Sequence, residues 1–232
     1  MPLGERPGAL GSSDLMDTLT CLRERRTCRG FLPRPVPPAL LDEILTDATW
    51  APSASNQQPW HFHSIEGETL ARLNQSVKQA HREHRKSYDP SKGKTIPPQY
   101  VERTKELFRS IRPFITQLGE GQAAFIESGS FRFYDAPAVI LITLHRDMPA
   151  VRYMDIGMAA QNLMLSAHAR GLGTCAIALT LMYTDAIRET LHLSEDMLPA
   201  LFIAVGYPDT DFTINRFRSG RNSLATFITR HT

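Results

Sequence analysis

The sequence has few cysteines, no long apolar run and little excess of charge of either sign. Cys21, Cys28 and Cys175 are an odd and low number for 232 residues, which argues against a disulfide framework and for a reducing compartment. The N-terminal stretch has no apolar segment of the kind found in signal peptides, and no run reaches the length of a membrane span. We therefore expect a cytoplasmic protein without a membrane partner.

The small charge excess and the missing motifs exclude several classes of function. A formal net charge of +2 gives no general reason to expect a nucleic-acid or membrane-surface partner. The G-x-S-x-G motif of serine hydrolases is absent from the sequence. His81 and His84 lie three residues apart without a third plausible ligand, so a surface pair is the better interpretation and we expect no metal site.

The composition predicts one globular domain of mixed structure. Hydrophobic residues make up 42% of the chain and charged residues 22%, as in proteins with a real core. Helical and strand patterns occur without the strict alternation of a doubly wound sheet, which favours an α+β fold. Residues 1–13 are rich in Gly, Pro and Ser and predict a disordered tail before a domain over 14–232. Within that domain, 86–130 has no strand pattern and predicts a variable helical excursion near the active site.

Apolar spacing predicts the individual elements. The predicted strands cover 59–65, 137–145, 175–179 and 198–205. The predicted helices cover 14–25, 37–51, 68–85, 99–118, 151–170 and 185–192. The first helix would be capped by Asp14 and would line up Leu15, Leu19 and Leu22 on one apolar face, whereas 68–85 resembles an exposed helix. The stretch from Phe212 has no core pattern before Leu224, which is typical of an arm on a partner subunit or of a solvated tail.

Two arginine clusters stand far apart in the chain. The first has four arginines and Thr27 between residues 23 and 29, at the predicted end of a helix, and the second spans 215–221. Guanidinium groups bind phosphate bidentately, and a hydroxyl adds a further donor. Either cluster alone is more often a solvated surface. The functional alternative is that both clusters converge on one phosphate.

Two glycine- and amide-rich segments allow more than one interpretation. The segment 51–60, A-P-S-A-S-N-Q-Q-P-W, is either an ordinary turn or a loop that brings amide groups to a flat polar ligand. Residues 171–176 spell G-x-G-x-x-A, the dinucleotide fingerprint. That motif needs a strand before it and a helix after it, and the predicted order here is reversed. Gly171 is therefore predicted to be the residue that ends a helix.

Taken together, four motifs resemble the nitroreductase family. They are R-R-T-C-R-G-F at 25–31, P-S followed by N-Q-Q-P-W within 52–60, A-Q-N-L and G-L-G-T within 160–174, and R-S-G-R at 218–221. Their order matches the family from about residue 14 to the end. The resemblance implies an α+β fold with a mixed or antiparallel central sheet flanked by helices, and an intertwined homodimer. It also implies FMN as cofactor, bound at the subunit interface, with NADPH or NADH as co-substrate.

The resemblance also assigns site residues. Arginines and Thr27 would hold the ribityl-phosphate, the 52–58 loop would lie along the isoalloxazine with Asn56 coming from the other subunit, and backbone at 178–179 would lie near flavin N5. The cofactor-binding set is Arg25, Arg26, Thr27, Arg29, Pro52, Ser53, Ala54, Asn56, Gln58, Ser130, Ala178, Leu179, Arg218 and Arg221. Arg29 is also the catalytic candidate, because a cation near N1 and O2 stabilises the reduced cofactor. Many relatives carry asparagine where this chain has Ser130, so the residue that contacts the pyrimidine edge is open, with Arg132 as one candidate.

The expected activity is hydride transfer from NAD(P)H to nitroaromatic or related electron-poor acceptors by a ping-pong mechanism. The alternatives are a quinone or free-flavin reductase, a dehalogenase-like member of the same family, an FMN-binding store with little turnover, and an interaction domain without cofactor. The sequence leaves open the physiological acceptor and the choice between NADH and NADPH.

Overall fold

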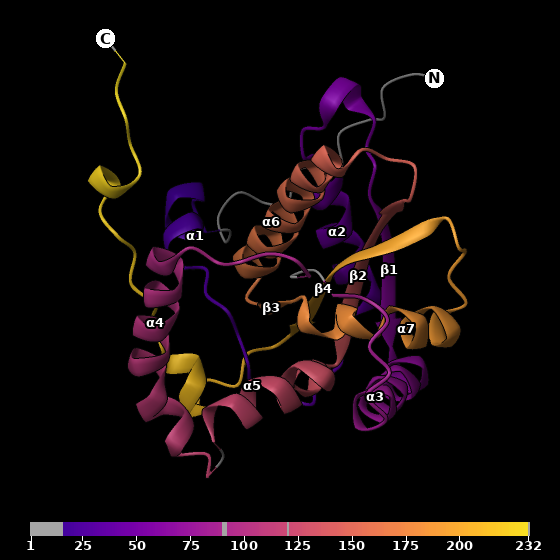
Figure 1. Ribbon diagram of the computed structural model, residues 1–232, viewed down its shortest axis with the longest axis horizontal. Helices are drawn as coiled ribbons and strands as arrows, with labels where there is room; N and C mark the ends of the chain where they lie inside the picture. The colour runs from indigo at the N-terminus through magenta and orange to yellow at the C-terminus, as the bar shows by residue number, and fades with distance from the viewer. Residues whose placement is uncertain (1–15, 90–91, 120, 232) are drawn as a thin grey trace.

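A central antiparallel sheet organises the chain. The computed structural model describes residues 16–89, 92–119 and 121–231. The strands are β1 (His61–Glu66), β2 (Ala138–His145), β3 (Gly173–Ile177) and β4 (Met197–Gly206), in the spatial order β1-β2-β4-β3. Every neighbouring pair is antiparallel (Figure 1). The α+β class and all four predicted strands are confirmed, and the sheet is antiparallel rather than mixed in the described residues.

Both faces of the sheet are covered, which explains the apolar character of its two inner strands. Along β2, Val139 and Leu141 belong to one core cluster, whereas Ile140 and Ile142 belong to the other. Successive strand residues point to opposite faces, so a strand covered on both sides needs apolar residues at every position. Accordingly, β2 is buried from Ala138 to Leu144.

Helices form a layer on each face (Figure 1). One core cluster is shared with α2 (Pro38–Thr49) and α6 (Tyr153–Ala169). The other is shared with α3 (Gly67–Arg82), α5 (Gln122–Phe131) and α7 (Thr184–Leu191). Two further helices, α1 (Thr18–Glu24) and α4 (Pro98–Thr116), lie to one side of the sheet. No helix among the described residues is long and apolar enough to span a membrane.

The end of α6 confirms the interpretation of Gly171. This glycine has φ of 76°, a conformation that costs other residues energy. The N–H of Leu172 donates to the carbonyl of Ala167 over 2.9 Å, and the N–H of Gly171 donates to that of His168 over 3.0 Å. These two bonds define a Schellman motif, the common C-terminal helix cap. The G-x-G-x-x-A string therefore ends a helix instead of binding a dinucleotide.

The start of α1 differs from the prediction. Asp17 is the N-cap, and its carboxylate accepts from the N–H groups of Leu19 and Thr20. Asp14 and Leu15 lie outside the described residues, as does the predicted tail over 1–13. Leu19 and Leu22 are 60% and 48% exposed, so the predicted apolar face is not buried within a single chain. The helix instead turns Cys21 inward, where its thiol donates to the carbonyl of Leu165 on α6.

Two other expectations need correction. The helix α3 is not fully exposed, because it buries the stripe Leu70, Leu73, Val77 and Ala80 against the sheet. Its many polar residues obscured that stripe in the sequence. The C-terminal stretch does contribute to the core, since Ile214 is buried and Phe217 packs against the same cluster. The exposed arm therefore begins after residue 217 rather than at Phe212.

Two short turns hold consecutive non-glycine residues in the left-handed region. One lies between α5 and β2, where Phe133, Tyr134 and Asp135 have φ of 51°, 53° and 56°. The other lies between α2 and β1, where Ser55 and Asn56 have φ of 51° and 53°. Such a conformation costs an L-residue about 1–2 kcal/mol. It persists only where the surroundings enforce it, and such sites are frequent next to binding sites.

Candidate functional site

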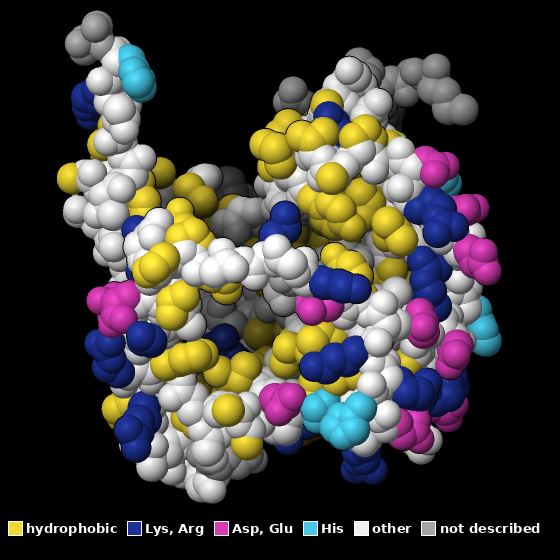
Figure 2. Space-filling model, in the orientation of Figure 1, with side chains coloured by type: hydrophobic (Ala, Val, Ile, Leu, Met, Phe, Trp, Pro, Cys, Tyr) yellow, Lys and Arg dark blue, Asp and Glu magenta, His cyan; other side chains and the backbone are white. Residues whose placement is uncertain are grey.

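The two arginine clusters meet in one cleft. Its volume is about 1210 Å³, and its walls come from the end of α1 with the loop that follows, from α4, and from the C-terminal stretch. The cluster arginines that line it are Arg23, Arg25, Arg26, Arg29, Arg218 and Arg221. Figure 2 shows the molecule hollowed between α4 and the body, with Lys or Arg side chains visible inside the hollow. The convergence that the sequence offered as an alternative is thus present in the fold.

Asn215 joins the two clusters. Its Oδ1 accepts from the N–H of Arg29 over 2.8 Å, across 186 positions of sequence. Its Nδ2 donates to the carbonyls of Gly30 at 2.7 Å and Asp209 at 2.8 Å. The side chain is buried, with 3% exposed, and these bonds use both its amide oxygen and its amide nitrogen. Asn215 therefore fixes where the first cluster lies relative to the second.

The loop that carries the first cluster is also docked on the sheet. The N–H of Cys28 donates to the carbonyl of Thr174 at the start of β3, over 2.8 Å. The N–H of Leu32 donates to Tyr207, just beyond β4, over 2.9 Å. Gly30 permits this approach, because a Cβ there would overlap the ring of Phe212. The arginines thus project from a backbone that is held along its length.

The electrostatics of the cleft favour an anion. It is lined by seven arginines, the six of the clusters and Arg103 of α4, against Glu24 and Glu106. None of the seven forms an ion pair with a carboxylate in the described part of the chain. Burial and the charge of Arg26 lower the pKa of Arg218, although Glu24 opposes that shift. Like charges gathered this way repel unless an anion lies among them.

Two guanidinium groups have buried donors that the protein does not satisfy. Arg25 Nε and Arg29 Nε have no hydrogen-bond partner among residues 16–89, 92–119 and 121–231. An unsatisfied buried donor costs about 1–3 kcal/mol, and more when the group is charged. Both arginines line the cleft. A ligand with several acceptor oxygens would satisfy these donors, and a phosphate has them.

The surroundings of Arg29 behind the cleft lining include a buried aromatic ring and two buried thiols. The guanidinium carbon of Arg29 lies 5.8 Å from the centre of the Tyr134 ring. Burial raises the pKa of the Cys28 thiol to about 11 and that of Cys175 to about 12. Both thiols are therefore protonated at neutral pH, and neither is a nucleophile. Neither thiol therefore offers a reactive group next to Arg29.

The predicted 52–58 residues lie apart from this cleft. Pro52, Ser53, Ala54, Asn56 and Gln58 follow α2, and none is among the residues that line the cleft of the described chain. All except the half-buried Ser53 are exposed. Ser53 Oγ accepts from the N–H of Gln58 over 3.0 Å, which closes the loop on itself. A single chain thus presents this loop to its surroundings.

Three more predicted residues are not among those that line the cleft. Ser130 is buried, and its hydroxyl donates to the carbonyl of Ile126 in its own helix over 2.7 Å. Ala178 is exposed and Leu179 half-buried directly after β3. Arg132, the suggested substitute for the missing asparagine, lies 2.9 Å from Asp135 in an ion pair. The Ser130 hydroxyl is thus used within its own helix, whereas Arg132 Nε is a buried donor that has no hydrogen-bond partner among the described residues in spite of the ion pair.

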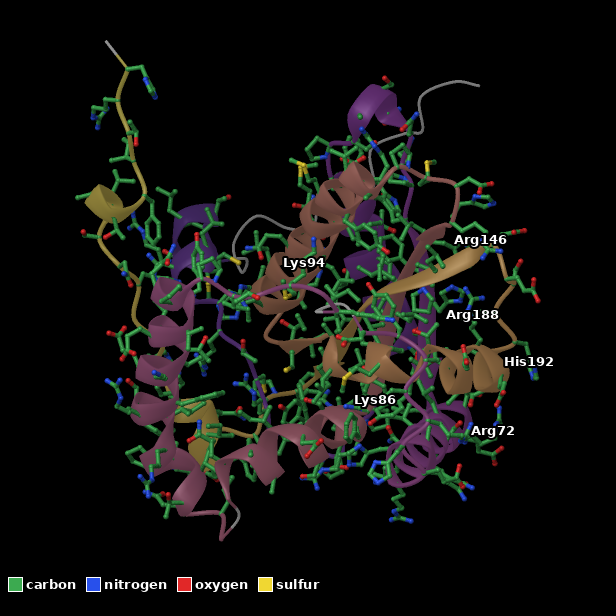
Figure 3. The ribbon with its side chains drawn as sticks, viewed as in Figure 1. Arg72, Lys86, Lys94, Arg146, Arg188 and His192 are labelled. Atoms are coloured by element: carbon green, nitrogen blue, oxygen red, sulfur yellow. The ribbon has the colours of Figure 1, made fainter. Side chains whose placement is uncertain are left out.

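A second group of cations lies on the opposite side of the molecule from α4. Figure 3 shows Arg146, Arg188, His192 and Arg72 along that edge. Arg188 is held by its own chain, since it donates to the carbonyls of Ser194 at 2.7 Å and Met197 at 2.6 Å. The groove here has about 410 Å³ and includes Glu189. Among the residues described, no group of three potential metal ligands occurs here or elsewhere.

The fold and the cleft define an α+β protein with an arginine-rich cleft whose charge favours an anion. Residues 22–207 match the sequence pattern of the Nitroreductase family, so the chain belongs to that family. This confirms the resemblance found in the sequence, and the enzyme class with it.

Relatives and solved structures support the same assignment. A chloronitrobenzene nitroreductase of Comamonas testosteroni is 31% identical over 94% of this chain and 97% of its own length. A 4-nitrobenzoate reductase of Pseudomonas putida is 31% identical over 88% and 90%. The crystal structure of the FMN- and NADPH-dependent nitroreductase NfnB from Sphigopyxis sp. strain HMH superposes with a TM-score of 0.86 at 26% identity, over 94% of this chain and 100% of that one. NfnB from Mycobacterium smegmatis, solved in complex with NADPH, gives 0.82 at 29% identity, over 92% and 97%.

Proposed function

We propose that this protein is an FMN-dependent oxidoreductase that passes hydride from NADPH or NADH to nitroaromatic or related electron-poor acceptors. The observation that carries the proposal is the convergence of two arginine clusters around buried guanidinium donors without partners. FMN ends in a single phosphate, which matches a cleft lined by arginines from two distant segments of the chain. The described relatives include FMN- and NADPH-dependent enzymes, which supports the same cofactor and donor.

The residues fit the cofactor in two groups. Arg25, Arg26 and Thr27 would hold the phosphate together with Arg218 and Arg221, because charge-assisted bonds to phosphate are the strongest that such side chains form. Arg29 would lie further in, beside the flavin ring. When bound, FMN supplies the two-electron chemistry. Arg29 would then stabilise the negative charge that develops at the pyrimidine end, as electrostatic preorganisation requires.

The exposed 52–58 loop supports a site shared between two copies of the chain. In this proposal Pro52, Ser53 and Ala54 lie along the isoalloxazine and Asn56 comes from the other subunit of a homodimer. Gln58 belongs to the same loop, and Ser130, Ala178 and Leu179 belong to the chain that holds the phosphate. This arrangement explains why the loop is exposed in a single chain.

The first test measures cofactor retention. Arg25→Ala and Arg221→Ala should each weaken FMN binding by roughly 10- to 100-fold, the equivalent of one lost charge-assisted bond. Fluorescence titration of the apoprotein with FMN measures the dissociation constants. Arg216→Ala is the matched control, because Arg216 is exposed in the same segment and does not line the cleft. Parent-like affinity in both cleft variants would show that these arginines are surface charges.

The second test measures turnover. With NADPH or NADH and a nitroaromatic acceptor, double-reciprocal plots at several acceptor concentrations should be parallel, because donor and acceptor would use one face in turn. A panel of nitroaromatics, quinones, free flavin and halogenated aromatics identifies the acceptor class. The names of the relatives favour nitroaromatics over the quinone, free-flavin and dehalogenase alternatives. Stopped-flow spectra that show no bleaching of bound FMN by either nicotinamide would leave an FMN store as the function.

A further inference from the structure

The ring of Tyr134 lies against Arg29, one of the residues that line the cleft. The distance of 5.8 Å from the guanidinium carbon to the ring centre is within the range of cation–π contacts. Tyr134 is only 5% exposed, so the contact is shielded from water. Burial raises the pKa of the Tyr134 hydroxyl, and the Cys175 thiol adds to that shift, while the charge of Arg29 opposes it. The phenol is therefore neutral at physiological pH and leaves the charge of Arg29 uncompensated.

An unfavourable backbone conformation is needed to place this ring. Tyr134 is the middle one of three successive left-handed residues in the turn Phe133–Asp135. The ion pair between Arg132 and Asp135 closes the turn on its exposed side, and Phe133 anchors it in the core against Phe202. A turn that is held from both sides in this way sets the position of Tyr134 rigidly.

Gly129 provides the space that the ring occupies. A Cβ on Gly129 would overlap the Tyr134 ring, so any other residue at this position of α5 would displace it. Glycine inside a helix costs about 0.5–1 kcal/mol relative to alanine. Ser130 next to it bonds to its own helix and leaves the space beside Arg29 to Tyr134. Gly129 and the left-handed turn at Phe133–Asp135 thus both cost stability, and both are needed to place the Tyr134 ring.

We propose that Tyr134 is a positioning residue for Arg29. The N–H of Arg29 donates to Asn215, which fixes the Arg29 backbone. The guanidinium group of Arg29 packs against the Tyr134 ring. The guanidinium then stays in the lining of the cleft with its Nε free to donate to a ligand. This inference rests on the proposed function, in which the pyrimidine edge of FMN lies there. Tyr134 would tune the reduction potential of the cofactor through Arg29 without touching it.

The test compares Tyr134→Leu, Tyr134→Phe, Arg29→Gln and the double variant Tyr134→Leu/Arg29→Gln. Spectroscopic redox titration gives the potential of bound FMN, and fluorescence titration gives its dissociation constant. Tyr134→Leu should weaken binding of reduced relative to oxidised FMN about tenfold, which lowers the two-electron potential by about 30 mV. Tyr134→Phe keeps the ring and should match the parent. The double variant should match Arg29→Gln, because both changes act on one interaction.

Each outcome separates the positioning role from the proposed function. An unchanged potential in Tyr134→Leu, or additive shifts in the double variant, would overturn the positioning role while FMN binding and turnover stand. A parent protein that binds no FMN would overturn both proposals. If Tyr134→Leu fails to fold, Gly129→Ala tests the same contact, because the added methyl group displaces the ring. It should lower the potential in the same direction, and an unchanged potential in this variant would equally overturn the role.

Discussion

Asn215 shows how one uncharged side chain can determine the position of several charged ones. It bonds to Arg29, Gly30 and Asp209 and lies three residues before Arg218. Sequence reasoning placed it only at the edge of a basic patch. A side chain that bonds to distant backbone has no characteristic spacing, so only the fold reveals such a role.

Replacing Asn215 with alanine should both destabilise the protein and weaken FMN binding. The substitution removes the partner of the Arg29 N–H and of the Asp209 carbonyl, while the Gly30 carbonyl keeps the Asp209 N–H and the Cys28 thiol. The free energy of unfolding should therefore fall by about 2–4 kcal/mol. Urea denaturation measures that loss. Gln75→Ala is the control, because Gln75 is exposed and does not line the cleft, and changes at exposed sites usually stay within about 0.5 kcal/mol. A parent-like urea midpoint for Asn215→Ala would contradict the role assigned to this residue.

At the scale of elements, the sequence predicted most accurately the strands that are buried along most of their length. The strands β2 and β4 are apolar at nearly every position because helices cover both faces of the sheet. The predicted and observed ends of these two strands differ by no more than one residue. The prediction was weakest where a helix hides its face among polar residues, as α3 does, or exposes apolar residues, as α1 does. In both helices the tertiary surroundings decide which side is buried. The local sequence pattern carries no information about those surroundings.

The candidate site likewise contains residues that the sequence could predict and residues that it could not. The arginines were predictable because guanidinium groups near a hydroxyl indicate phosphate whatever the fold. The sequence predicted a helical excursion over 86–130 near the active site, but it did not predict which residues of α4 line the cleft. Arg103, Glu106 and Ile111 form one wall of it. Nothing local in 99–118 marks these three residues, because their role depends on where the chain returns after Phe217.

At the scale of the whole molecule, the exposed apolar residues predict a dimer. Leu19 and Leu22 on α1 and Met154 on α6 are 60%, 48% and 67% exposed, and α1 packs on α6. Exposed apolar patches of this kind mark interaction sites. Light scattering should give twice the 26.0 kDa chain mass for the parent.

Charge placed on that surface should separate the two copies. Met154→Glu should shift the mass toward 26.0 kDa and weaken FMN binding, because the 52–58 loop of a second copy would be lost. Gln75→Glu, on the exposed side of α3, is the control and should remain dimeric. A parent that is monomeric and fully active at nanomolar concentration would rule out the shared site.

The bond between Arg29 and Asn215 has a consequence for how the protein is made. Its two partners are 186 positions apart, and a ribosome adds roughly 5–20 residues per second. The first arginine cluster therefore leaves the ribosome roughly ten to forty seconds before the segment that fixes it. Until Asn215 arrives, the growing chain presents Arg25, Arg26 and Arg29 without their opposite wall. In the proposed function, capture of FMN would therefore wait until Asn215 has been added, and a chain truncated before Asn215 should bind FMN more weakly than the full chain.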